Sequence, residues 1–225
     1  SGALQYNAAF DSSSAQTLSL LTELRHAVEH HELRLYLQPK VPLHGQPGLA
    51  AEALVRWQHP QRGLVPPMQF IPFAEQTGFV RHLTLWMFEE VARLLADPRT
   101  QGLPLRVSVN LSTRDLLDPE LSHRLADILV RHGVAASAFC LEITESAIMD
   151  DPQRAEAMLN RLSEQGFKLS IDDFGTGYSS LAYLKRLPVD ELKIDKSFVM
   201  GMETGEDDAM IVRSTIDLAH NLGLT

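Results

Sequence analysis

The sequence predicts an α/β fold in which strands alternate with helices around a mostly parallel sheet. Short apolar runs rich in β-branched residues are separated by longer segments with helical periodicity. Most of the helical segments end at a glycine or an Asp-Pro pair, and the next strand follows within a few residues. The length of 225 residues suits one domain of barrel size with a full core.

The chain is expected to begin with a segment outside the folded domain. Residues 1–17 are small and polar without sustained periodicity, which is typical of a linker or of the tail of a preceding domain. A helical pattern runs from Leu18 to about His30. We therefore expect the domain to occupy residues 18–225.

The first two strands are predicted to pair antiparallel. They are LRLYLQP (33–39) and LAAEALVRW (49–57), and only Lys40 and the segment VPLHGQPG (41–48) separate them. A parallel pair needs a crossover of about a dozen residues or more, so this connection favours a hairpin.

Regular alternation is expected after the hairpin. A helical face ending at Asp97-Pro98 precedes the strand RVSVNLS (106–112). Asp118-Pro119 and Asp151-Pro152 offer helix N-caps with proline at the first helical position, and Gly133 and Gly166 end these helices. The strands FCLEITES (139–146) and KLSIDDF (168–174) follow the two glycines.

A last helix is predicted from the spacing of Ile211, Thr215, Leu218 and Leu222, and Gly223 ends it. With the strand ELKID (191–195), six strands are expected. An eight-stranded barrel would thus lack its last two strands, and the next strand is expected just beyond Thr225.

Composition excludes several classes of protein. A net charge of −9 argues against non-specific binding to duplex nucleic acid. Cys140 is the only cysteine, so no disulfide forms within the chain, which suits a reducing compartment. The sequence has neither an apolar run long enough to span a membrane nor a signal-peptide pattern, so we expect a cytoplasmic domain without membrane contact of its own.

The strands share a chemical feature, because each of five apolar runs carries an acid, an amide or a lysine near its end. These residues are Glu52, Asn110, Glu142, the pair Asp172-Asp173, and Lys193. Buried carboxylates are costly unless a cation or hydrogen bonds compensate them. Oxygen donors of this kind suit Mg²⁺ or Mn²⁺ rather than zinc. The pattern predicts a divalent-metal site at the carboxyl ends of a parallel barrel.

The pattern favours two ions over one. Asp172 and Asp173 point to opposite faces in a regular strand, but both can reach ions where the chain turns at the strand end. A carboxylate that bridges two divalent ions is typical of phosphoryl-transfer hydrolases. Lys193 is then predicted to orient water or to neutralise a phosphate.

These segments resemble successive signatures of one family, the EAL domain of cyclic-di-GMP phosphodiesterases. The resemblance runs from about Leu33 to the end of the chain, in the segments LQPKV, EALVRW, SVNLS, LEITES, IDDFGTGYSSL and LPVDELKIDKSFV. It implies a TIM-like (β/α)8 barrel with an antiparallel first strand. It also implies hydrolysis of cyclic-di-GMP to linear pGpG by a water activated by two Mg²⁺ or Mn²⁺ ions.

The resemblance also implies roles for single residues. Glu52, Asn110, Glu142 and Asp172 resemble the ligands of one ion, and Asp172 with Asp173 those of the second. Lys193 matches the lysine beside the nucleophilic water, Glu145 the acid that anchors the DFGTGYSS loop, and Gln38, Leu54 and Arg56 the contacts to substrate. A homodimer through the region of residues 173–180 is expected.

Other interpretations of these residues stay open. Taken singly, Glu52 or Glu142 is a salt-bridged strand-end acid, Asn110 a turn former and Lys193 a surface lysine. Family members continue into a strand with a further glutamate that assists the second ion, and this chain lacks it. The alternative is therefore an inactive EAL domain that serves as a cyclic-di-GMP receptor or as a scaffold for a partner.

Overall fold

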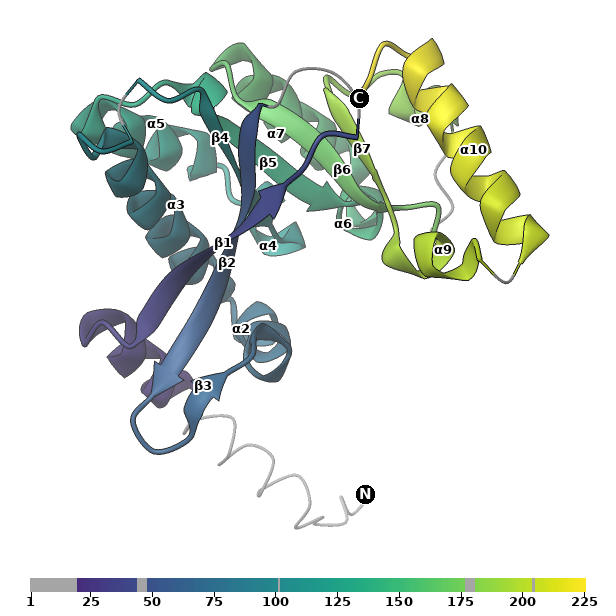
Figure 1. The fold of residues 1–225 in the computed structure, drawn as a ribbon. Helices are drawn as coiled ribbons and strands as arrows, with labels where there is room; N and C mark the ends of the chain where they lie inside the picture. Colours follow the sequence, from purple (N-terminus) through teal and green to yellow (C-terminus); the bar gives the residue numbers. More distant parts are fainter. Residues whose placement is uncertain (1–19, 44–47, 101, 177–180, 204) are drawn as a thin grey trace, which may run out of the picture.

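A single curved sheet organises the chain (Figure 1). The computed structural model describes residues 20–43, 48–100, 102–176, 181–203 and 205–225. The strands of the sheet are β1 (Leu33–Lys40), β2 (Leu49–His59), β3 (Gly63–Val65), β4 (Leu105–Leu111), β5 (Phe139–Thr144), β6 (Lys168–Phe174) and β7 (Glu191–Ile194). They lie in the order β1-β2-β4-β5-β6-β7, with β3 beside β2. The α/β prediction is confirmed, whereas the expected linker over residues 1–17 lies outside the described residues.

The hairpin at the start of the sheet forms as predicted. β1 and β2 pair antiparallel, and Gln38 lies opposite Glu52. From β2 to β7 every neighbouring pair on the main path is parallel. β3 was not predicted, because its three residues are too few to show a period of two.

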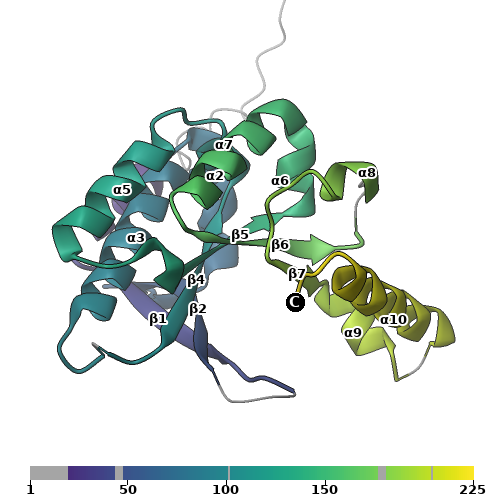
Figure 2. The ribbon, with the colours of Figure 1, turned by 90° about the horizontal axis from the view of Figure 1, so that it is seen from above.

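Helices follow the strands in sequence. Those longer than two turns are a helix over 20–29, α3 (Val80–Ala96), α5 (Leu121–His132), α7 (Pro152–Glu164) and α10 (Glu206–Asn221). The shorter ones are α2 (Ile71–Thr77), α4 (Thr113–Leu116), α6 (Glu145–Asp150), α8 (Leu181–Leu184) and α9 (Lys196–Gly201). Figure 2 shows α3, α5 and α7 along one side of the sheet, with α9 and α10 beside β7 at its end.

The strands separate an apolar outer face from a polar inner face. Val107 and Val109 of β4, Leu141 of β5 and Leu169 of β6 are buried in one core with residues of α3, α5 and α7. The alternate positions, which point to the opposite face, carry Ser108, Asn110, Glu142, Ser170 and Asp172. Apolar burial against helices thus fixes the register that turns the polar residues inward.

A second core supports the far end of the hairpin. Trp57 of β2 and Phe70 are fully buried and meet edge to face at 5.7 Å. Leu24 of the helix over 20–29 and Ala74 of α2 belong to the same cluster. This core packs around the part of the β1-β2 pair that extends beyond β4, which lies at the lower left of Figure 1.

The helix ends agree only in part with the predicted caps. Asp151 caps α7 by accepting a hydrogen bond from the Arg154 amide, as expected. The prediction that Asp118-Pro119 starts α5 is wrong, because that helix begins at Leu121. The Asp118 carboxylate instead accepts the Glu120 amide and closes a turn before the helix.

The buried face of the last helix agrees with the predicted one except at Ile211. Val212, Thr215 and Ala219 of α10 are buried, whereas Ile211 is 38% exposed. The helix packs against α9 and β7, while Leu218 and Leu222 are partly buried against the apolar core.

A carboxylate joins α3 to α5. Glu89 accepts two hydrogen bonds from the Arg131 guanidinium at 3.1 Å each, and lies 2.8 Å from His132 Nε2. Burial opposes ionisation of Glu89, but hydrogen bonds and charges from His132 and Arg131 lower its pKa overall.

We expect Glu89→Gln to lower the free energy of unfolding by about 1 kcal/mol or less near neutral pH, since the pair is partly solvated. A lowered pKa in the folded state means that this contribution is present above the unfolded-state pKa and is lost as pH falls through the folded-state pKa. Urea denaturation at neutral and acidic pH checks this. Glu90→Gln is the control, because its partner Arg93 lies on the same helix. A deficit that persists in acid would contradict the assignment.

Cys140 is fully buried in β5, and burial raises the pKa of its thiol to about 12, which suits an inert core residue. Within the described part of the chain, none of the helices is long and apolar enough to cross a bilayer.

Candidate functional site

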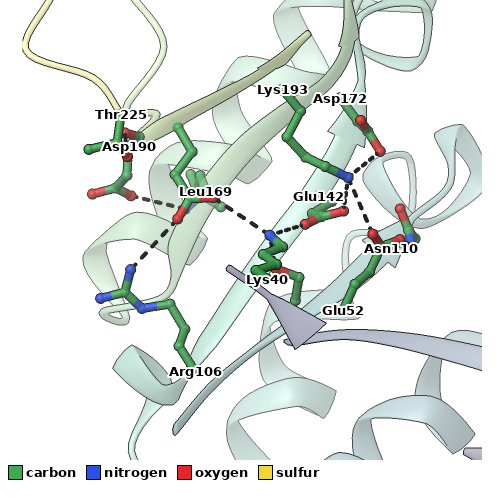
Figure 3. A network of polar contacts seen from close by, with 12 residues as sticks. Lys40, Glu52, Arg106, Asn110, Glu142, Leu169, Asp172, Asp190, Lys193 and Thr225 are labelled. Atoms are coloured by element: carbon green, nitrogen blue, oxygen red, sulfur yellow. Dashed lines mark hydrogen bonds and ion pairs between the residues drawn. The ribbon is translucent and has the colours of Figure 1, made fainter. Parts of the chain in front are cut away.

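The inner face of the sheet collects the predicted polar residues into one cluster (Figure 3). Five strands contribute one residue each: Glu52 from β2, Asn110 from β4, Glu142 from β5, Asp172 from β6 and Lys193 from β7. Parallel pairing sets Asn110 opposite Glu142. Residues separated by as many as 141 positions therefore meet because parallel strands end at the same rim.

Lys193 lies at the centre of this carboxylate cluster. Its Nζ donates to Glu142 Oε2 at 2.5 Å and to Asp172 Oδ2 at 2.8 Å, and lies 3.5 Å from Glu52 Oε2. Burial alone would lower the pKa of Lys193, but the hydrogen bonds and charges of Asp172 and Glu142 raise it above its usual value. The side chain is therefore a firmly protonated ammonium group.

Glu142 is the most buried member of the cluster, with a side chain that is 0% exposed. Lys40 Nζ donates to its Oε1 at 2.6 Å, and Lys193 holds its Oε2. Burial raises the pKa of Glu142, and the two ammonium groups more than offset this, so the pKa lies below its usual range. The carboxylate is ionised and fixed through both oxygens.

Sequence reasoning missed Lys40. A lysine at a strand end before a turn resembles a surface lysine, although two positions separate it from Gln38 and the two therefore share a face. Glu191 was also missed, because an acid at the start of a strand resembles a surface residue. It lies two positions before Lys193 on β7, and the two therefore share a face.

Glu52 links the amide to the ammonium. Asn110 Nδ2 donates to Glu52 Oε1 at 3.0 Å, while Oε2 of the same carboxylate faces Lys193. Asn110 is therefore held by a side chain of the cluster rather than by a turn.

The two aspartates at the end of β6 depart from regular strand geometry. The register shifts between Ile171 and Phe174, and Asp173 adopts a left-handed φ of 53°. The Asp173 amide donates to Asp172 Oδ1 at 2.9 Å. Burial and then the charges of Asp172 and Asp195 raise the pKa of Asp173. The chain thus leaves regular strand geometry at the end of β6, where the two aspartates lie.

Glu145 contacts the glycine-rich segment after β6. Its side chain is buried, and its Oε2 accepts a hydrogen bond from the Gly175 amide at 3.0 Å. Gly175 has a φ of 98°, a conformation that favours glycine. The rest of the predicted dimer segment, residues 177–180, lies outside the described residues.

The three residues predicted to contact substrate lie on the hairpin. Gln38 lines a cavity of about 410 Å³ with Glu52 and Lys193. Leu54 lines a second cavity of about 580 Å³, which extends over α2 and α3 and also reaches Asn110. Arg56 lies farther along β2, where its guanidinium is 5.8 Å from the centre of the Tyr36 ring. The carboxylate cluster thus opens into cavities on both sides.

The donor set of the cluster is rich in oxygen, as the predicted divalent ions require (Figure 3). Among the described residues, no three acidic, histidine or cysteine side chains already form a metal-binding group. Three carboxylates nevertheless converge within 3.5 Å of one cationic nitrogen, Nζ of Lys193. Such oxygen donors around a positive charge fit a hard divalent ion, provided that the ammonium group moves aside.

Comparison with known proteins decides the family. The sequence profile of the EAL domain matches residues 21–225. The chain belongs to the EAL domain family. The resemblance of its motifs to this family is thereby confirmed. The fold matches that of a solved EAL-family structure, which agrees with the predicted TIM-like barrel.

Curated relatives of this EAL domain are larger proteins. It is 40% identical over 220 residues to the bifunctional diguanylate cyclase/cyclic di-GMP phosphodiesterase MucR of Pseudomonas aeruginosa, covering 97% of this chain and 32% of that protein. It is 38% identical over 207 residues to the cyclic di-GMP phosphodiesterase PdeR of Escherichia coli, covering 92% and 31%. The chain thus spans about a third of the length of these relatives.

Solved structures agree with the fold. The c-di-GMP complex of the PaMucR phosphodiesterase superposes with a TM-score of 0.87 at 42% identity, covering 92% of this chain and 84% of that one. The FimX EAL domain of Pseudomonas aeruginosa bound to c-di-GMP has a TM-score of 0.83 at 26% identity, covering 91% and 82%.

Proposed function

We propose that this EAL domain, occupying residues 18–225 of the chain, hydrolyses one phosphodiester bond of cyclic-di-GMP and releases linear pGpG. The convergence of Glu52, Glu142 and Asp172 on a single cationic centre carries the proposal. Relatives that share about 40% of its residues are named cyclic di-GMP phosphodiesterases, which supports the same substrate.

The proposed cofactors are two Mg²⁺ or Mn²⁺ ions. Glu52, Asn110, Glu142 and Asp172 would hold one ion, and Asp172 with Asp173 the second. Bound in this way, the ions would supply an activated water and stabilise the oxyanions of the phosphodiester. The turn at Asp173 supports the second site, because it releases the two aspartates from the strict alternation of a regular strand.

Lys193 is proposed to act as a hydrogen-bond donor. Its raised pKa keeps the amine protonated near neutral pH, so it cannot serve as a general base in this arrangement. Released from Glu142 and Asp172, the ammonium group can orient the attacking water or neutralise the phosphate.

The hairpin is proposed to bind the dinucleotide. Arg56 offers a guanidinium that can contact a phosphate through two parallel hydrogen bonds. Leu54 contributes an apolar wall to the larger cavity beside Asn110, which suits a flat base. Gln38 lies next to Glu52 in the sheet and can donate to a phosphate oxygen or sugar.

Glu145 is proposed to connect the metal site to the dimer interface. Its hydrogen bond to the Gly175 amide ties α6 to the segment that follows Asp172 and Asp173. We infer a homodimer through the region of residues 173–180, which includes the Gly175 amide of this hydrogen bond. The single buried cysteine suits a cytoplasmic domain, which is the proposed location.

The test is hydrolysis by the full-length protein. With Mg²⁺ or Mn²⁺, the protein should convert cyclic-di-GMP to pGpG. Chromatography measures the pGpG that forms. Glu52→Ala should abolish turnover because it removes a metal ligand, and Glu164→Ala, an exposed residue of α7, should not. Full activity of Glu52→Ala would overturn the metal assignment.

A second candidate function is a receptor that binds cyclic-di-GMP without cleaving it. The similarity to the FimX EAL domain, whose structure contains bound c-di-GMP, supports this second candidate. Tight binding of cyclic-di-GMP with no pGpG would replace the enzyme by the receptor.

A further inference from the structure

Lys40 bridges strands that do not touch in the sheet. β1 pairs with β2, and both β2 and β4 lie between β1 and β5 in the strand order. The Lys40 side chain nevertheless reaches across the inner face to Glu142 Oε1 at 2.6 Å and to Ser108 Oγ at 2.6 Å. Figure 3 shows it entering the cluster on the side opposite Lys193.

Two charged side chains behind Lys40, those of Glu191 and Arg106, help to hold its ammonium group in place. Glu191 Oε2 lies 3.8 Å from Lys40 Nζ, and Glu191 Oε1 lies 3.6 Å from Arg106 Nη1. Three acceptors on β4, β5 and β7 thus surround the ammonium group of a side chain that is 30% exposed. Rotation of the lysine would break contacts to more than one strand.

The two oxygens of Glu142 have different partners. Lys40 binds Oε1 on the side of Glu191, whereas Lys193 binds Oε2 and also contacts Glu52 and Asp172. Holding one oxygen determines the direction of the other, because the carboxylate is rigid and planar. Lys40 therefore fixes the oxygen that faces the cation position.

We propose that Lys40 is a positioning residue that orients Glu142 as a metal ligand. This inference rests on the proposed function, because it assigns Lys40 a role behind one of the proposed ligands. Partners that hydrogen-bond to a ligand orient it, and their loss typically weakens metal affinity or activity about 10- to 100-fold.

A purely electrostatic role predicts the opposite sign. Removing a positive charge beside a carboxylate makes the site more negative, and this alone would tighten binding of a divalent cation. Weaker binding after loss of Lys40 is therefore a signature of lost orientation.

The experiment measures Mn²⁺ binding to the full-length protein by electron paramagnetic resonance of free Mn²⁺. We expect Lys40→Met to weaken Mn²⁺ binding about 10-fold, with turnover at limiting Mn²⁺ falling in parallel. Lys40→Arg should recover part of the affinity, because it retains a charged donor. Lys168→Met is the matched control, since Lys168 pairs with Asp190 rather than with the cluster.

The outcomes separate this inference from the proposed function. If the unsubstituted protein binds Mn²⁺ and forms pGpG while Lys40→Met binds Mn²⁺ equally well or more tightly, the positioning role is overturned alone. If the unsubstituted protein neither binds Mn²⁺ nor forms pGpG, the proposed function fails and the role falls with it. Circular dichroism of each variant verifies that the fold is retained.

Discussion

Lys193→Met is expected to lower the free energy of unfolding of the metal-free protein by about 3 kcal/mol and to reduce turnover by about 100-fold or more. The ammonium group is the shared partner of Glu52, Glu142 and Asp172. Its removal leaves carboxylates that are mostly shielded from solvent without that positive charge, and Lys40 then contacts only one of them.

Urea denaturation with and without Mn²⁺ measures the effect on stability. Because a divalent ion would occupy the position that Lys193 vacates, Mn²⁺ should restore more stability to Lys193→Met than to the unsubstituted protein. Lys185→Met, at an exposed position, is the control. Equal stabilities without metal would show that the carboxylates do not depend on Lys193.

Glu142→Gln is expected to reduce turnover more than 100-fold while the protein stays folded. This exceeds the loss typical of a residue that only hydrogen-bonds to a metal ligand. The glutamine keeps the size of the side chain but cannot provide a charged ligand. Lys193 retains Asp172 and Glu52 as partners, and Lys40 retains Ser108 and Glu191. The two ammonium groups therefore remain compensated.

The measurements for Glu142→Gln are pGpG formation and the midpoint of thermal unfolding. Glu164→Gln on the exposed face of α7 controls for the loss of a charge. Loss of activity together with unfolding would assign Glu142 a structural role, and retained activity would remove it from the proposed ligands.

The sequence was sufficient to predict the alternating part of the fold. Buried residues such as Val107 and Leu141 recur with a period of two, and Gly133 ends its helix in a left-handed conformation, so local patterns carried the information. β3 and the true start of α5 were not predictable in this way. A three-residue strand shows no period, and the turn at Asp118 competes with the helix for the same cap.

The site was predictable as a set of residues but not as a set of contacts. Strand ends identified Glu52, Asn110 and Glu142, because parallel strands end at one rim. The sequence could not show that Lys193 occupies the centre of the carboxylates, nor that Lys40 reaches Glu142 across two strands. Those contacts depend on the curvature of the sheet, which no local pattern encodes.

The most direct test is a crystal structure of the protein with cyclic-di-GMP and Mn²⁺, read through the anomalous signal of manganese. We predict manganese bound by Glu52, Asn110, Glu142 and Asp172, a second ion at Asp172 and Asp173, and Lys193 Nζ displaced from Glu142. A cluster that keeps its lysine-centred ion pairs, with manganese absent from these carboxylates, would contradict the two-metal site.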